Sequence, residues 1–194
     1  MIDDFFENIK PIDLSMAICH SGGADGADTY FEKIGEEYGI ITKAYSYQTP
    51  KHNSPNKVEI SEEDYLEGID EINRANHQLG RYGIHKYMNL LARNWAQIKY
   101  SEETFAIGNI VEPGKKGNRG YYNKSKHQQV DGGTGYACAM SIIHEHPTYV
   151  YDQVQQQWFE WSFIISKYKK CEVPTIKLDR KSTRLNSSHQ IISY

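Results

Sequence analysis

The stretch "VDGGTGYACAMSIIHEHPTYVYD", residues 130–152, places three glycines ahead of a helical pattern and an apolar β-type run behind it. The helical pattern stops at His146-Pro147, because proline cannot continue a helix. Thr148 to Tyr151 then has the composition of a strand. Glycines at the start of a helix let a ligand approach the backbone, where helix N–H groups attract anions. The loop is therefore either a phosphate site or only a tight turn.

A second glycine cluster, "SGGADGAD" at residues 21–28, follows an apolar run and precedes a predicted helix over 29–38. Ligands of parallel sheets bind beyond the carboxyl ends of the strands, and two such loops in one small domain favour phosphate binding. The acids Asp25, Asp28 and Asp131 would repel a phosphate, so we expect them to cap helices or to hold ribose hydroxyls. The candidate ligand-binding residues of the two loops are Ser21, Gly22, Gly23, Asp25, Gly26, Asp28, Gly132, Gly133, Thr134 and Gly135.

Strand and helix patterns alternate along the rest of the chain. Helices are predicted over residues 2–10, from a cap at Ser61 to a break near Gly80 and Gly83, over 85–100 and over 155–169, and strands over 40–47 and 104–111. The last helix carries Trp158 and Trp161, which we assign to the core. The alternation predicts an α/β fold: a single Rossmann-like three-layer domain with a mainly parallel sheet, spanning residues 1–178.

The composition narrows the function classes. The 194 residues carry a formal net charge of −3, which makes nucleic acid an unlikely partner. Three cysteines without a CxxC pair indicate reduced thiols and a cytoplasmic protein. The acidic N-terminal residues do not resemble a signal peptide, and no apolar run approaches the roughly 20 residues that span a bilayer, so we expect no membrane partner. A homo-oligomer is left open.

The last sixteen residues, "DRKSTRLNSSHQIISY" at 179–194, lose the hydrophobic pattern of the chain. They resemble a translated sequencing-adapter read-through, and the alternative is a plain disordered tail. On either interpretation, we expect this segment to lie outside the fold.

Five motifs occur in a characteristic order over residues 14–153: "SGGADGAD", "LLARNW", "ETFAIG", "DGGTGYACAM" and "PTYVYD". In this order they resemble the SLOG superfamily of Rossmann-like nucleotide-binding domains, which includes the LOG phosphoribohydrolases, the YspA-like proteins and the DprA recombination mediators. The YspA-like branch is the most similar, and this chain adds an insertion at about residues 111–129. The resemblance implies a nucleotide-type small molecule as partner and no additional cofactor.

LOG-type hydrolases carry a GGxGTxxE loop and an upstream arginine. The resemblance puts three family glycines on the second loop, the arginine near Arg93, which Asn94 follows, and the glutamate on Ala139. Because alanine cannot act as an acid or base, the resemblance implies binding with the known chemistry in doubt, and Asp28 and Asp131 are only weak candidates to replace the carboxylate. The alternatives are a LOG-like nucleoside 5'-monophosphate phosphoribohydrolase, a sensor of a signalling nucleotide, and a DprA-like single-stranded DNA-binding protein.

Several further residues have two interpretations. Arg93 is either a helix-surface residue or a guanidinium that clamps a phosphate. The basic loop before the second glycine cluster is either a solvated loop or a mobile lid that stacks a tyrosine on a base. Its residues are Lys115, Lys116, Arg119, Tyr121, Tyr122, Lys124 and Lys126. His144 and His146 lie two residues apart, on different helix faces, so we predict no metal site.

Overall fold

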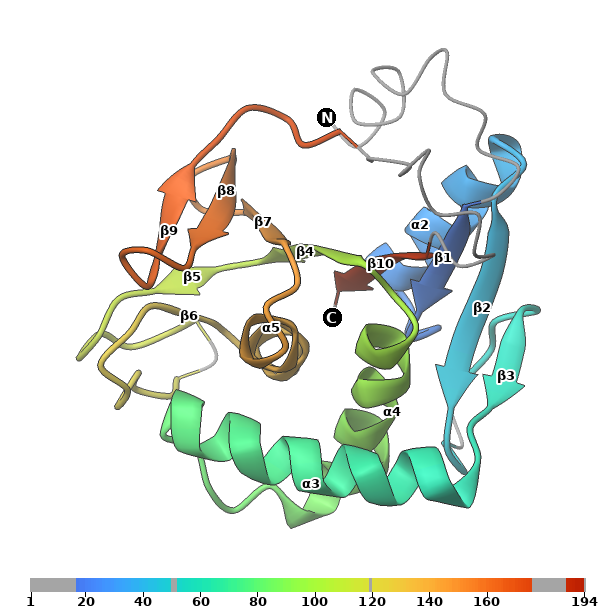
Figure 1. Cartoon of the computed structure of the whole chain (residues 1–194), viewed down its shortest axis with the longest axis horizontal. Helices are drawn as coiled ribbons and strands as arrows, with labels where there is room; N and C mark the ends of the chain where they lie inside the picture. Colours follow the sequence, from blue (N-terminus) through green and yellow to red (C-terminus); the bar gives the residue numbers. More distant parts are fainter. Residues whose placement is uncertain (1–16, 50–51, 119, 176–187, 194) are drawn as a thin grey trace.

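The computed structural model describes residues 17–49, 52–118, 120–175 and 188–193, and eight strands of this part form one sheet (Figure 1). The order is β3-β2-β1-β10-β4-β7-β8-β9. Neighbours from β3 to β7 run parallel, whereas β8 and β9 are antiparallel at one edge. The bounds are β1 Ile18–Ser21, β2 Ile41–Ser46, β3 Lys57–Glu59, β4 Glu103–Gly108, β7 Thr148–Asp152, β8 Gln157–Ser162, β9 Lys167–Lys170 and β10 Ser188–Ser193. The expected α/β class with a mainly parallel sheet is confirmed.

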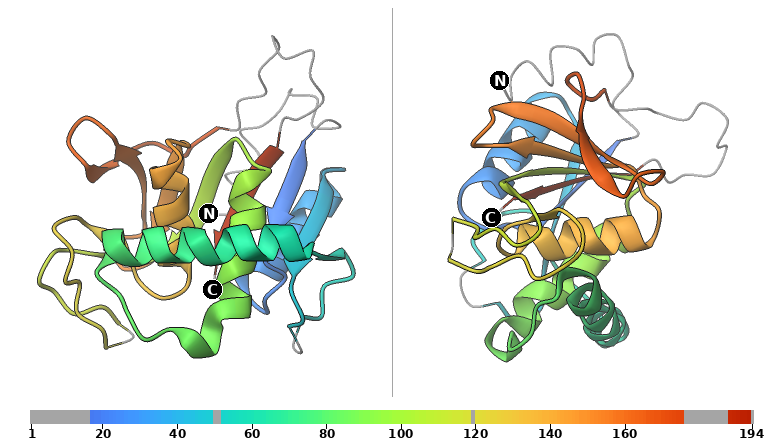
Figure 2. Two further views of the ribbon diagram at one scale, coloured as in Figure 1. Left: turned by 60° about the horizontal axis from the view of Figure 1, so that its bottom comes forward. Right: turned by 90° about the vertical axis from the view of Figure 1, so that its left-hand side faces the viewer.

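Helices cover both faces of the sheet. Phe105 of β4 packs in one core cluster with Phe31 of α2 (Ala27–Glu37). The next residue, Ala106, points to the other face and packs with Cys138 of α5 (Thr134–Ile143). α4 (Met88–Lys99) lies beside α5, and α3 (Glu62–Leu79) crosses both on the outside (Figure 2). A 3-10 turn, η2 (His85–Tyr87), precedes α4, and a small antiparallel pair joins β5 (Ile110–Val111) to β6 (Gln129–Val130).

The capping residues that the sequence offered determine where α3 begins and ends. The Ser61 hydroxyl accepts the backbone N–H of Asp64 at 3.0 Å, and acidic residues fill the first turn, where they favour the helix dipole. Gly80 follows the last residue with a φ of 62°, a left-handed conformation that glycine adopts without strain. The predicted start and break of this helix are therefore confirmed.

The helix predicted over residues 155–169 is wrong, because this segment forms the β8–β9 hairpin. Trp158 packs with Tyr151 in the core cluster on the α2 side, whereas Trp161 packs with Cys138 on the α5 side. Residues three apart lie on opposite faces of a strand, so both faces of β8 are buried. The spacing of the two tryptophans therefore reflects a strand with two buried faces and not the apolar face of a helix. Each tryptophan is 5% exposed, which confirms its assignment to the core.

The expectation that residues 179–194 lie outside the fold does not hold for Ser188–Ser193, which form β10 between β1 and β4. β1 and β4 each hydrogen-bond to β10 in parallel register, with Ile191 opposite Phe105. The β-branched pair Ile191-Ile192 is the strand signal that the composition of the segment obscured. Residues 179–187 and 194, like the helix predicted over 2–10, lie outside the described residues.

The three cysteines are all free thiols, and burial keeps them protonated. It raises the pKa of Cys138 to about 12 and that of Cys171 to about 11. Both thiols are therefore protonated near neutral pH, and the reactive form, the thiolate, is disfavoured. In the described part of the chain, no helix combines the length and the apolar character needed to cross a membrane.

The crossing of α3 with α4 depends on Gly68. A methyl group added there would lie 2.4 Å from the carbonyl oxygen of Ala92, whereas one added at Gly35 of α2 would lie 3.5 Å from its nearest neighbour. We expect Gly68→Ala to lower the free energy of unfolding by about 1–3 kcal/mol through overpacking. The matched variant Gly35→Ala should be neutral or should gain up to about 1 kcal/mol from helix propensity. Urea unfolding measures both, and a Gly68→Ala variant as stable as Gly35→Ala would contradict the close crossing.

Candidate functional site

The first glycine loop is bonded to its own chain. Its backbone N–H groups are the donors that a phosphate would need. Those of Gly23, Ala24 and Gly26 donate to the side chains of Ser21, Asp28 and Thr29 at 3.0, 3.1 and 3.2 Å, respectively. In this arrangement the loop resembles a satisfied turn more than an open anion site.

The carboxylate of Glu32 and the imidazole of His52 lie against the first loop. The Ser21 hydroxyl donates to Glu32 at 2.7 Å, and Ser54 donates to the same carboxylate. A methyl group added at Gly23, whose φ is +63°, would lie 2.3 Å from the ring of His52. Burial and then the charge of Arg93 lower the pKa of His52, so this ring is neutral near pH 7. Asp25 is exposed at the surface of the loop.

Arg93 is fully buried, at 1% exposure, so the interpretation as a helix-surface residue is wrong. Its guanidinium donates to the carbonyl oxygen of Gly22 and, at 3.0 Å, to that of Tyr45 at the end of β2. The side chain thus ties α4 to the first loop and to the neighbouring strand. Asn94, the next residue, is also completely buried.

The second glycine loop is more open. The N–H of Asp131 donates to the carbonyl of Asn109, and the N–H of Gly132 donates to the Asp131 carboxylate, both at 2.9 Å. Within the described ranges, no hydrogen bond engages the backbone N–H groups that follow, those of Gly133, Thr134 and Gly135. These N–H groups form the N-terminus of α5, where the helix dipole favours a negative charge.

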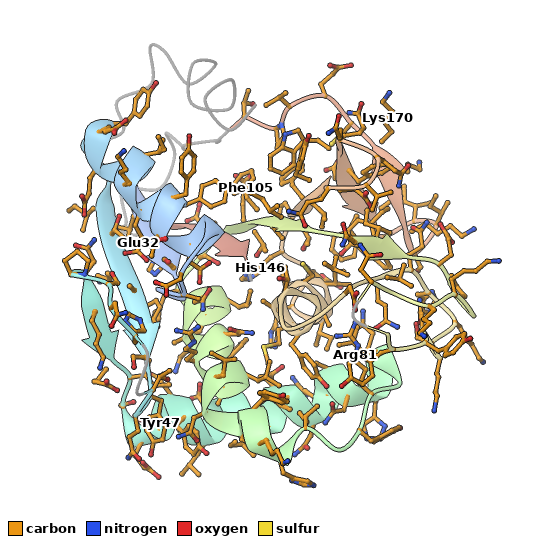
Figure 3. All side chains as sticks on the ribbon, turned by 180° about the vertical axis from the view of Figure 1, so that it is seen from behind. Glu32, Tyr47, Arg81, Phe105, His146 and Lys170 are labelled. Atoms are coloured by element: carbon orange, nitrogen blue, oxygen red, sulfur yellow. The ribbon has the colours of Figure 1, made fainter. Side chains whose placement is uncertain are left out.

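Arg81 holds the second loop as Arg93 holds the first. Its guanidinium donates to the carbonyls of Gly132 and Val130 at 2.7 and 2.6 Å, and it lies over the ring of Tyr136, beside α5 (Figure 3). A methyl group at Gly135 would lie 2.1 Å from the carbonyl oxygen of Val130 and 3.0 Å from both terminal nitrogens of Arg81, so a glycine makes room for this contact. Burial lowers the pKa of Arg81, but an arginine remains charged.

Arg81 was not among the site residues predicted from the sequence. The one local signal was its position between Gly80 and Gly83, at the break that separates two helices.

A cavity of about 490 Å³ adjoins the second loop. Four exposed tyrosines line it together with Lys124 and the loop residues Asp131, Gly132 and Gly133; these tyrosines are Tyr82, Tyr87, Tyr121 and Tyr122. The volume suits a small organic ligand. The structure therefore brings the tip of the basic loop together with the second glycine loop, whereas the first-loop candidates, Arg93, Thr134 and Gly135 are not among the residues that line this cavity.

The basic loop is an anchored hairpin in the part that the structure describes. Asn123, at 2% exposure, donates through its side-chain amide to the carbonyls of Val111 and His127, both at 2.8 Å. Backbone hydrogen bonds join Asn123 to Lys115 and Gly114. Lys115, Lys116 and Lys126 do not line the cavity, and Arg119 lies outside the described residues. The base of this loop is thus fixed, and its exposed tip carries the tyrosines.

The position that the LOG resemblance assigns to a glutamate faces the core. Ala139 is 2% exposed and belongs to a cluster that contains Ile72 and Leu79 of α3. Of the two acids considered as replacements, Asp131 lines the cavity and Asp28 lies in the first loop. In the described residues, no group of three or more histidine, cysteine or acidic side chains has the arrangement of a metal site.

Searches against family models, curated proteins and solved structures returned no match for this chain. The likeness to the SLOG superfamily consequently rests on the motifs of the sequence.

Proposed function

We propose that the protein is a SLOG-like, Rossmann-like domain that binds a nucleotide or a nucleotide-derived small molecule in the tyrosine-lined cavity. One observation carries this proposal: the N-terminus of α5 and four exposed tyrosines line the same cavity. Helix N-termini attract phosphate groups, and aromatic rings stack on bases. A ligand that carries both a phosphate group and a base is a nucleotide.

Each residue of the cavity has a role in this proposal. The phosphate accepts a hydrogen bond from the N–H of Gly133 at the N-terminus of α5, and Lys124, which lines the same cavity, contributes a positive charge. Arg81 fixes the loop by occupying its carbonyls, which would otherwise repel the phosphate. Asp131, which also lines the cavity, accepts a hydrogen bond from a ribose hydroxyl, as acidic residues do in dinucleotide-binding folds.

Gly133→Asp tests the proposal. The residue has a φ of −68° and a ψ of −34°, which any amino acid adopts, so the fold should be retained. The added carboxylate blocks the N–H groups and repels a phosphate, and we expect nucleoside monophosphates to bind at least about tenfold more weakly, a loss of about 1.4 kcal/mol or more. Thermal stabilisation by AMP, GMP, CMP and UMP measures the change.

Two controls make this experiment specific. Gly133→Ala introduces a side chain without charge and should retain more affinity than Gly133→Asp. Asp25→Asn alters an exposed residue of the first loop and should leave binding unchanged. Stabilisation that persists in Gly133→Asp, or none in the unmodified protein, would overturn the proposed function.

A further inference from the structure

A second cavity, of about 670 Å³, adjoins the tyrosine-lined cavity. Both cavities have Gly80, Tyr82 and Lys124 in their walls, so they meet at the end of α3. Each volume lies within the range of a small-molecule site, and a single nucleotide in the first cavity would leave the second one unfilled.

The second cavity is lined by basic and aromatic side chains. Lys126, His77 and His127 lie in its wall together with Phe163, and none of the described residues that line it is an aspartate or a glutamate. Within the described part of the chain, no ion pair engages Lys124 or Lys126. Since the whole chain is acidic, this is a local excess of positive charge that suits a second anionic group. The ring of Phe163, 45% exposed, offers a second stacking surface.

The wall that carries these cations is held in place. The Ser125 hydroxyl donates to the side-chain oxygen of Asn123 at 2.7 Å and accepts the backbone N–H of His127 at 3.3 Å. Farther along, the N–H of Tyr168 in β9 donates to the side chain of Gln128 at 2.7 Å. A fixed wall loses little conformational freedom when a ligand binds, which favours a specific site over a passing attraction.

We propose that the ligand is a dinucleotide-type molecule, in which a second phosphorylated, ring-bearing unit extends past Tyr82 into the second cavity. One ring system stacks among the tyrosines of the first cavity and the other against Phe163. Lys124, which lines both cavities, binds the diphosphate that joins the two units, and Lys126 binds the phosphate of that bridge that belongs to the second unit. This inference rests on the proposed function, because it takes the first unit to occupy the tyrosine-lined cavity.

Titration calorimetry tests the proposal. It compares AMP with the 5'–5' diphosphate-linked diadenosine compound, and GMP with the corresponding diguanosine compound. The unmodified protein should bind the dinucleotide at least about tenfold more tightly than the mononucleotide of the same base. Lys126→Glu should remove this difference while leaving mononucleotide affinity unchanged. The matched variant Lys115→Glu changes an exposed lysine of the same hairpin that lines neither cavity, and it should keep the difference.

The outcomes separate the two proposals. Mononucleotide binding without a gain for the dinucleotide, or a gain that survives Lys126→Glu, would overturn the inference and leave the proposed function standing. If neither ligand binds, both proposals fail. A single-stranded oligothymidylate of twenty nucleotides that binds more tightly than either dinucleotide, with strong salt dependence, would identify the two cavities as a nucleic-acid surface and would also overturn the inference.

Discussion

Arg93→Met is expected to lower the free energy of unfolding by about 1–3 kcal/mol. The substitution keeps much of the buried volume but removes the donors that the carbonyls of Gly22 and Tyr45 accept from. The Gly22 carbonyl is then left without this donor, at a cost of about 1–3 kcal/mol, whereas the Tyr45 carbonyl keeps its bond from the His52 ring at 3.2 Å. Arg93→Lys should be destabilised as well, because a single ammonium group lacks the planar fork that reaches two carbonyls at once.

Urea unfolding measures this loss, and Lys33→Met is the control. The Lys33 and Glu37 side chains are 71% and 54% exposed and lie 3.9 Å apart, and exposed ion pairs contribute at most about 1 kcal/mol. Because Arg93 does not line the tyrosine-lined cavity, folded Arg93→Met should bind nucleotides as the unmodified protein does. An Arg93→Met variant that keeps its stability but loses nucleotide affinity would instead identify Arg93 as the phosphate clamp that the resemblance implies.

The parts of the fold that local signals determine could be predicted from the sequence. Gly132 and Gly133 mark the start of α5, Pro147 separates the end of α5 from the start of β7, and Ser61 marks the start of α3. The β8–β9 hairpin could not be predicted in this way. Its tryptophans satisfy a helical spacing and a strand buried on both faces equally well, and only the neighbouring layers decide between the two.

The parts of the candidate site that lie close together in the sequence could be predicted. The second glycine loop and the nearby Tyr121 and Tyr122 are close in sequence, and the structure places them around one cavity. Arg81 donates to carbonyls about fifty residues away, and no local pattern reveals such a contact. Arg93 stood out in the sequence, but its environment depends on Gly22, seventy-one residues before it in the chain. Long-range packing therefore determines what each arginine does.

At position 139, too, the local motif and the long-range packing lead to different expectations. A motif-based substitution would introduce glutamate there to restore the LOG-type carboxylate. In the structure, however, Ala139 packs among apolar side chains between α5 and α3, so the new carboxylate would be buried without a partner. We expect Ala139→Glu to lower the free energy of unfolding by several kcal/mol at pH 7, because desolvation of a carboxylate costs about that much in a protein interior. It should release no free base from nucleotides.

The pH dependence makes this prediction specific. Burial raises the pKa of the new glutamate in the folded state above its unfolded value of about 4.3. Below that value, the side chain is protonated in both states and the penalty is smallest. As the pH rises from there toward the folded-state pKa, only the unfolded chain loses its proton, and stability falls by about 1.4 kcal/mol per pH unit. Ala139→Gln adds similar volume without a charge, so its penalty relative to the unmodified protein should not change with pH. If Ala139→Glu is as stable as Ala139→Gln at pH 7 and releases base from AMP, then residue 139 faces the ligand, and the protein retains the architecture of a phosphoribohydrolase.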